Sequence, residues 1–367
     1  MGQSSDSSGR QDGESLTERA ERLLGEGMAS SALALLEDAR PARPPADYPF
    51  IDRLIGRALL DLGRHGEAYT TLQAALANPA IDGDDRAQVL LLDVLGNVHH
   101  AAGHFQAAAE VFGRALYHAE RLDPPDHALR ARLHVNLGST ALKSGQVEAA
   151  TIYYERAVEA ARQAHDLRRL GMAYMGLGFA RQQARDYGAA LAHTGEAMRL
   201  FERAGDARQM MQARTNLALI YAEQGDWEAA VPHLQEVLGQ ARADGDAGGI
   251  AHALELLARA GASRGDHARA AELAAEARVT AERSGDGLEA HLAGVTEASA
   301  LVVLGQDAAA EELYRRAIAY FREAGATRHL MSASQGYAAA LRGWGRNDEA
   351  LEVLDAAYTA LMDLRQG

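Results

Sequence analysis

The stretch LALIYAEQGDWEAA, residues 217–230, decides the fold because its spacing recurs along the whole chain. Ala218 stands seven residues before the glycine at 225, and Ala230 follows that glycine by five. The same turn position, always with Ala five residues later, recurs at intervals of 36, 40 or 42 residues. A fixed period of this length is the signature of a repeat architecture. The turn positions are Gly27, Gly63, Gly103, Gly145, Arg185, Gly225, Gly265, Gly305 and Gly345.

Two further markers predict that each repeat is a pair of helices. Apolar residues between the turns recur at intervals of three and four, as in Leu313, Ala317 and Tyr320, which is the helical period. Gly-Asp pairs such as Gly245-Asp246 come 40 residues apart, and they suit a helix C-cap followed by the N-cap of the next helix. Each repeat is therefore predicted to be a first helix (helix A), a turn, a second helix (helix B) and a Gly-Asp turn.

This pattern resembles the tetratricopeptide repeat. Its Leu-Gly, Gly-Asp-aromatic and Ala signature is matched by Leu95-Gly96, then Gly103, His104-Phe105 and Ala108. The resemblance covers about residues 15–365, but the repeats are 40 rather than 34 residues long and lack the usual Pro after helix B. The long form is similar to the repeats of Rap-type bacterial peptide receptors, cell-polarity adaptors and kinesin light chains. It implies an all-α, right-handed superhelical solenoid of about nine helix-turn-helix repeats, with helix A lining the concave face.

The repeat spacing also predicts how the chain is divided. Residues 1–14 are polar and rich in Gly and Ser, so we expect a disordered tail. Residues 15–40 form a degenerate first repeat, and the Pro-rich segment 41–49 a stiff linker. Residues 50–367 then form eight stacked units in one solenoid, with turns at Gly63, Gly103, Gly145, Arg185, Gly225, Gly265, Gly305 and Gly345.

Composition excludes several classes of protein. The 367 residues include no Cys, which excludes disulfides, thiolate nucleophiles and Cys-ligated metals. The sequence has no apolar run long enough to cross a bilayer and no signal peptide, so we expect a cytoplasmic protein without membrane contact. The net charge of −14 makes nucleic acid an unfavourable partner. Abundant Arg and Ala beside the single Lys143 are typical of a GC-rich bacterial genome.

No sequence motif predicts catalysis. The phosphate-loop pattern GxxxxGK[ST] and the zinc motif HExxH are missing from the sequence. The letters of the nucleophile elbow GxSxG occur at 261–265, but they fall on the helix A–B turn of repeat 7 and not on the strand-to-helix turn that the motif requires. The closest histidines, at 99, 100 and 104, are separated by a turn and suit exposed helix positions better than a metal site. We therefore predict a protein that is not an enzyme and that uses no cofactor and no metal.

The inward face of helix A is the better candidate site. Its positions lie 13, 10, 9, 6, 3 and 2 residues before the turn, and in repeats 7 and 8 they include His252, Glu255, Leu292, Val295 and Ser299. The residues predicted to bind a peptide or partner are Arg53, Arg57, Asn97, His100, Arg132, Asn136, Lys143, Phe179, Gln182, Gln212, Asn216 and Arg259.

The resemblance suggests roles for two residue types in this set. In the Rap-like and polarity-adaptor families, helix A asparagines bind the peptide backbone, and Asn97, Asn136 and Asn216 stand at the matching positions. The arginines of repeats 2 and 4 resemble those with which chaperone-binding repeats grip a peptide's terminal carboxylate, although Val94 replaces an expected amide. A structural alternative stays open for both types. The asparagines could bond to a neighbouring helix and fix repeat stacking, and the arginines could pair with acidic residues of the solenoid.

These observations favour a non-enzymatic interaction module. It would hold an extended peptide or a partner helix in the concave helix A groove, and it would act as a regulator through a separate partner protein. One alternative is a passive assembly scaffold or a homodimeric structural protein that pairs through the apolar face of the last helix, Leu351, Leu354, Ala357, Tyr358 and Leu361. A nucleic-acid-binding regulator is a weaker alternative, because the arginines do not form a stripe with aromatic residues.

Overall fold

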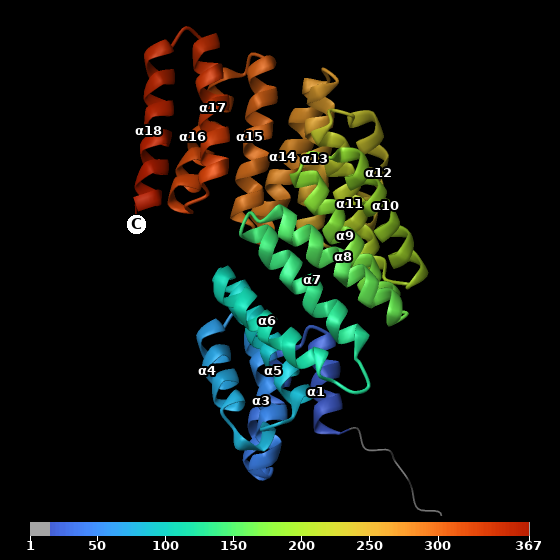
Figure 1. Cartoon of the computed structure of the whole chain (residues 1–367). Helices are drawn as coiled ribbons and strands as arrows, with labels where there is room; N and C mark the ends of the chain where they lie inside the picture. The colour runs from blue at the N-terminus through green and yellow to red at the C-terminus, as the bar shows by residue number, and fades with distance from the viewer. Residues whose placement is uncertain (1–14, 367) are drawn as a thin grey trace, which may run out of the picture. The chain divides into compact units, whose positions relative to one another are not determined.

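The chain is built of paired helices, as the repeat predicts (Figure 1). The computed structural model describes residues 15–366, and the tail expected at 1–14 lies outside this range. The described residues form two compact units, which divide after Asp206, and they contain no β-strand. The α-helices of the first unit are α1 Leu16–Gly25, α2 Ala29–Ala39, α3 Tyr48–Asp61, α4 His65–Leu76, α5 Asp85–Ala101, α6 Phe105–Glu120, α7 His127–Lys143, α8 Val147–Gln163, α9 Leu167–Gln183 and α10 Tyr187–Arg203. Those of the second are α11 Ala207–Glu223, α12 Trp227–Asp244, α13 Ala247–Ser263, α14 His267–Ser284, α15 Gly287–Val303, α16 Asp307–Glu323, α17 Thr327–Gly343 and α18 Asn347–Gln366.

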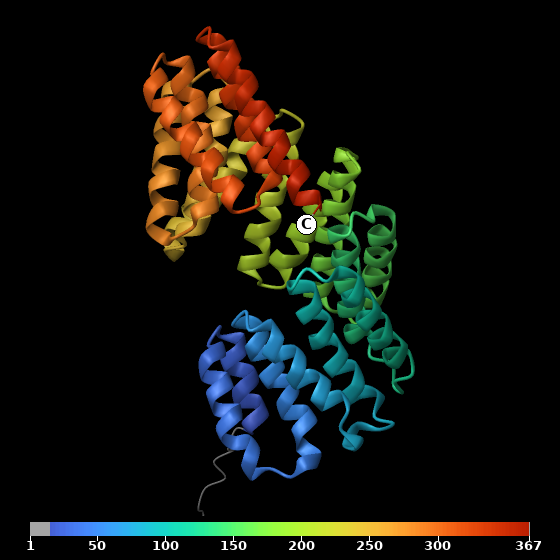
Figure 2. The ribbon, with the colours of Figure 1, turned by 90° about the vertical axis from the view of Figure 1, so that its left-hand side faces the viewer.

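Within each unit consecutive helices pack against one another, so that each repeat is a helical hairpin stacked on the next (Figure 2). Odd-numbered helices from α3 onward are the predicted A helices, and even-numbered ones the B helices. From α7 to α17 each helix has 17 or 18 residues, which accounts for the 40-residue period. Every helix in the described range is too short or too polar to cross a membrane.

Small residues seven positions before each turn let the two helices of a hairpin approach closely. A Cβ atom added at Gly96 on α5 would lie 2.5 Å from the buried ring of Phe112 on α6. The same atom at Gly138 on α7 would lie 2.8 Å from Tyr154 on α8. In these hairpins an aromatic side chain therefore fills the space that a side chain on helix A would otherwise occupy.

The turns need a left-handed backbone conformation. The turn glycines have φ between +71° and +81°, a region that glycine adopts without steric cost. Arg185, which replaces the glycine of repeat 5, has the same left-handed conformation with φ at +59°. The predicted caps also form, since Gly245 ends α12 in the left-handed region and the Asp246 carboxylate accepts the backbone N–H of Gly249. The hairpin geometry thus follows from local sequence.

The start of the chain departs from the regular period. Helices α1 and α2 form a short hairpin with its turn at Gly27. Two 3-10 turns, Arg40–Ala42 and Pro45–Asp47, lead into α3, and a third, Pro79–Ile81, separates α4 from α5. The buried Asp52 carboxylate on α3 is paired with Arg40 at 2.5 Å, which ties this connection to α3.

Candidate functional site

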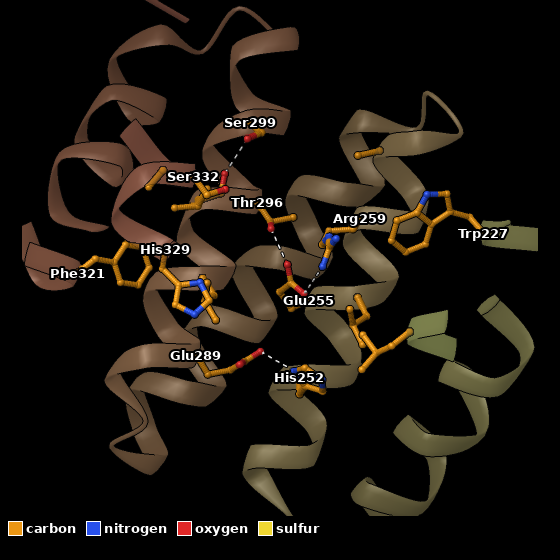
Figure 3. A pocket seen from close by; sticks show the side chains of 16 residues that line it. Trp227, His252, Glu255, Arg259, Glu289, Thr296, Ser299, Phe321, His329 and Ser332 are labelled. Atoms are coloured by element: carbon orange, nitrogen blue, oxygen red, sulfur yellow. Dashed lines mark hydrogen bonds and ion pairs between the residues drawn. The ribbon is translucent and has the colours of Figure 1, made fainter. Parts of the chain in front are cut away.

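A cavity of about 530 Å³ opens on the helix A side of the second unit (Figure 3). Its walls come from four successive A helices, α11, α13, α15 and α17, with one aromatic residue each from α12 and α16. Leu219, Leu256, Leu292 and Val295 give it apolar walls. Because consecutive A helices present the same register to one side, residues about 40 positions apart meet around one space.

Glu255 is the most buried ionisable group of the cavity wall. It lies on α13 with 7% of its surface exposed, and one carboxylate oxygen accepts a hydrogen bond of 2.7 Å from the Thr296 hydroxyl on α15. The Arg259 guanidinium, one turn further along α13, lies 3.9 Å from the other oxygen. Burial raises the pKa of Glu255, and the charge of Arg259 only partly opposes that rise.

A second carboxylate faces the same cavity. Glu289, in the first turn of α15, lies 3.4 Å from Nδ1 of His252 on α13. This contact raises the pKa of His252, because the carboxylate favours the protonated ring. Figure 3 shows both carboxylates on the cavity wall with their partners from the adjacent A helix.

Aromatic side chains frame the polar centre. The Arg259 guanidinium lies over the Trp227 ring at 5.5 Å from its centroid, a cation–π contact that draws it to the α12 side of the cavity. On the α17 side, His329 lies beside Phe321 with ring centroids 5.6 Å apart. The cavity thus combines a polar centre with apolar and aromatic walls, the usual composition of a binding pocket.

Sequence reasoning identified part of this site. His252, Glu255, Leu292, Val295 and Ser299 stand at expected groove positions, and all five line the cavity. Of the twelve predicted binding residues, Arg259 lines it. The contributions of Trp227, Glu289 and His329 were missed. Trp227 follows the turn, while Glu289 and His329 stand 16 residues before their turn glycines, one helical turn beyond the positions considered.

In the first unit, two predicted arginines are engaged within the chain. Arg53 pairs with Glu21 at 2.8 Å, and Arg57 pairs with Asp61 on its own helix at 3.1 Å. These contacts match the structural alternative for the arginines, pairing with acidic residues of the solenoid.

Three more of the predicted binding residues contact Asp93. This aspartate on α5 is 5% exposed; its carboxylate lies 3.0 Å from Arg132 and accepts a 3.0 Å hydrogen bond from the Asn136 amide, both on α7. The Asn97 amide donates to the backbone carbonyl of Asp93 at 2.8 Å. Burial raises the pKa of Asp93, and the arginine charges oppose that rise. Here too the structural alternative describes the contacts, because Asn136 joins two repeats.

The remaining predicted residues are distributed over both units. His100 lies 3.0 Å from the Thr140 hydroxyl, and burial lowers its pKa. Lys143 is exposed, the Phe179 side chain is 43% exposed, and Gln182 is buried.

The two predicted residues on α11 lie apart from the main cavity. Gln212 lines a second hollow of about 530 Å³, formed by α11, α12 and the start of α13. Asn216 is half-buried, one residue after Thr215 of the same hollow. Within residues 15–366, no three His, Asp or Glu side chains converge in a way that could hold a metal ion.

Several solved structures have a similar all-helical architecture. The apo form of RapI has a TM-score of 0.74 at 13% identity, covering 96% of this chain and 98% of that one. The apo form of the quorum sensor NprR from B. thuringiensis has a TM-score of 0.68 at 12% identity, covering 96% of this chain and 99% of that one. The Rap conjugation gene regulator of the plasmid pLS20, in complex with the Phr* peptide, has a TM-score of 0.55 at 11% identity, covering 96% of this chain and 95% of that one.

At these identities the structural likeness concerns the fold, and family membership comes from the sequence. No curated protein sequence matches the chain. The family model for the tetratricopeptide repeat matches residues 91–163, 169–243 and 209–282, which together make up just over half of the chain. The chain therefore belongs to the tetratricopeptide-repeat family.

Proposed function

We propose that this chain is a non-catalytic binding module whose second unit holds an extended segment of a peptide or partner protein in the helix A cavity. The observation that carries the proposal is the cavity itself, because side chains from α11, α13, α15 and α17 converge on one space of about 530 Å³. A space of this size suits a few side chains of a bound segment. Its mixed lining offers hydrogen-bonding groups for orientation and apolar walls for affinity.

The comparisons support a regulatory role. A regulator of the same fold is named as a complex with a peptide, and another is named a quorum sensor. We propose that this chain likewise acts by binding, and that it passes a signal to a separate partner protein. A passive scaffold would use the same cavity without any change in a partner's affinity.

A cavity-filling substitution tests the proposal. Ser332 on α17 is exposed at the cavity wall, so Ser332→Trp should fill the space without burying a polar group. Pools of random fifteen-residue peptides would be passed over the immobilised chain, and retained peptides would be identified by mass spectrometry. We expect the wild type to retain a subset that the Ser332→Trp variant loses.

The matched control is Ala339→Trp, an exposed position of the same helix that does not line the cavity. This variant should retain the same peptides as the wild type. Equal retention by all three proteins would place binding elsewhere, and an absence of retention by the wild type would contradict the peptide-binding proposal.

A further inference from the structure

The two units each bury a carboxylate at the same place in the repeat. Asp93 and Glu255 both lie on a helix A, ten residues before the turn glycine of their repeat. Each accepts a hydrogen bond from the residue nine positions before the next turn, Asn136 in one case and Thr296 in the other. The surroundings of the two carboxylates can therefore be compared position by position.

In the first unit the chain supplies the counter-charges for this carboxylate. Arg53 and Arg57 come from the preceding helix A, and Arg132 comes from the following one. Arg132 contacts Asp93 at 3.0 Å, while Arg53 and Arg57 attract it from further away. The charge of Asp93 is thus compensated by cations on both neighbouring repeats.

In the second unit the same three positions carry no charge. Thr215, Leu219 and Leu292 occupy the positions equivalent to Arg53, Arg57 and Arg132. Both leucines line the cavity, so an apolar wall and open space stand where the first unit has arginines. Among residues 15–366, Arg259 is the cation that pairs with Glu255 within 4 Å, at 3.9 Å, and its guanidinium also lies over Trp227.

This arrangement leaves a buried charge that the chain compensates only in part. Removing a carboxylate from water is unfavourable unless a cation pairs with it closely. Glu255 and Glu289 bring two carboxylates to the cavity wall. His252 pairs with Glu289 at 3.4 Å, so the cation left close to Glu255 is the Arg259 guanidinium at 3.9 Å. A bound cation could therefore interact with Glu255 where the equivalent arginines interact with Asp93.

We propose that the cavity accepts a basic side chain, lysine or arginine, of a bound peptide, and that Glu255 receives its charged head group. The inference rests on the proposed function, since it assumes that the cavity holds a peptide. The aliphatic stem of the side chain would pack on Leu219 and Leu292, because lysine and arginine bury their stems on apolar surface while the head group stays with polar partners. The net charge of −14 also favours a basic segment during encounter.

The experiment uses peptide pools that differ in one residue type. Four fifteen-residue pools share a random background free of Lys and Arg, in which one position carries Lys, Arg, Gln or Glu, and each is passed over the immobilised full-length chain. We expect about tenfold stronger retention of the Lys or Arg pool than of the Gln pool, as for one charge-assisted bond. The Lys and Arg arms show which head group is preferred.

Two substitutions should remove this preference. Glu255→Gln keeps the shape and the Thr296 hydrogen bond but loses the charge. Leu292→Arg places an arginine at the position that Arg132 occupies in the first unit, so the chain would supply its own cation. Leu288→Arg, at an exposed leucine of the same helix that does not line the cavity, is the matched control and should keep the preference. Thermal melts of all variants show that each is folded.

The outcomes separate this inference from the function on which it rests. Retention that does not distinguish Lys or Arg from Gln, and that Glu255→Gln leaves unchanged, would overturn the basic-side-chain inference while the binding proposal stands. If no pool is retained by the wild type above the Ser332→Trp variant, both proposals are wrong.

Discussion

At the scale of single residues, the small residue seven positions before each turn sets how closely the two helices of a hairpin approach. Gly96 leaves room for the fully buried Phe112 ring, and a methyl group there would require the ring to move. We predict that Gly96→Ala lowers the free energy of unfolding by about 1–3 kcal/mol, the usual range for overpacking. Urea unfolding followed by circular dichroism measures this change.

A second glycine serves as control. Gly113 lies within α6, and a Cβ added to it meets no atom within 4 Å. Gly113→Ala should therefore leave stability unchanged or raise it by up to about 1 kcal/mol, because alanine favours the helix. If both substitutions destabilise equally, the explanation by close approach is wrong.

A buried histidine gives the first unit a dependence on pH. His134 on α7 is 9% exposed, and no residue in the described part of the chain forms a hydrogen bond with its Nδ1 atom. Burial, together with the charges of Arg156 and Arg130, lowers its pKa from 6.5 to about 4. The folded state therefore binds fewer protons than the unfolded chain between these values, so the contribution of His134 is present above pH 6.5 and is lost as pH falls toward 4.

We predict that His134→Phe reduces this loss. The substitution keeps a ring beside Tyr153 but cannot be protonated, so between pH 6.5 and 4 the variant should lose up to about 3 kcal/mol less stability than the wild type. Denaturant titrations at several pH values measure the difference. His104→Phe, at an exposed position, is the matched control for replacing a histidine by phenylalanine.

At the scale of helices, the last one presents apolar side chains to solvent. Leu351 and Tyr358, seven residues apart on one face of α18, are 56% and 58% exposed. We predict that the chain dimerises through this face, and that the double substitution Leu351→Gln and Tyr358→Gln makes it monomeric with an unchanged helical signal. Sedimentation velocity over a range of concentrations measures this, with the exposed Thr359→Gln as control. A wild type that stays monomeric at all concentrations would show that α18 does not pair.

The helices could be predicted from sequence because their signals are local. Turn glycines, Asp caps and the 3.6-residue period act within a few residues, and the structure confirms the all-helical repeat that they predict. The distance of each residue from its turn glycine also predicted that Glu255 and Arg259 lie on the inward face of helix A. Sequence reasoning could not show which repeats leave a cavity, since that depends on how side chains from several helices fill one space. The hydrogen bond between Asn136 and Asp93 could not be predicted either, because an amide and a carboxylate at these positions could equally bind a peptide or the neighbouring helix.

At the scale of the whole molecule, the described residues form two compact units despite a continuous repeat. In repeat proteins each hairpin is stabilised mainly by its neighbours, so a defect spreads over a limited distance. We predict that Gly96→Ala speeds amide hydrogen exchange in α5 and α6 and leaves α15 to α18 unchanged. Exchange followed by mass spectrometry tests this, and equal acceleration in both units would show that they unfold together.

The hydrogen bond from each buried carboxylate to the next repeat has a consequence for rearrangement of the gene. Removing residues 286–325 would excise one full period and preserve the spacing of every remaining turn. It would also bring Gly336 to the place of Thr296, and glycine has no side-chain donor for Glu255. The hairpins are therefore alike in backbone but are not interchangeable. Duplication or loss of a repeat in this chain is constrained by the side-chain hydrogen bonds that each repeat forms with the next one.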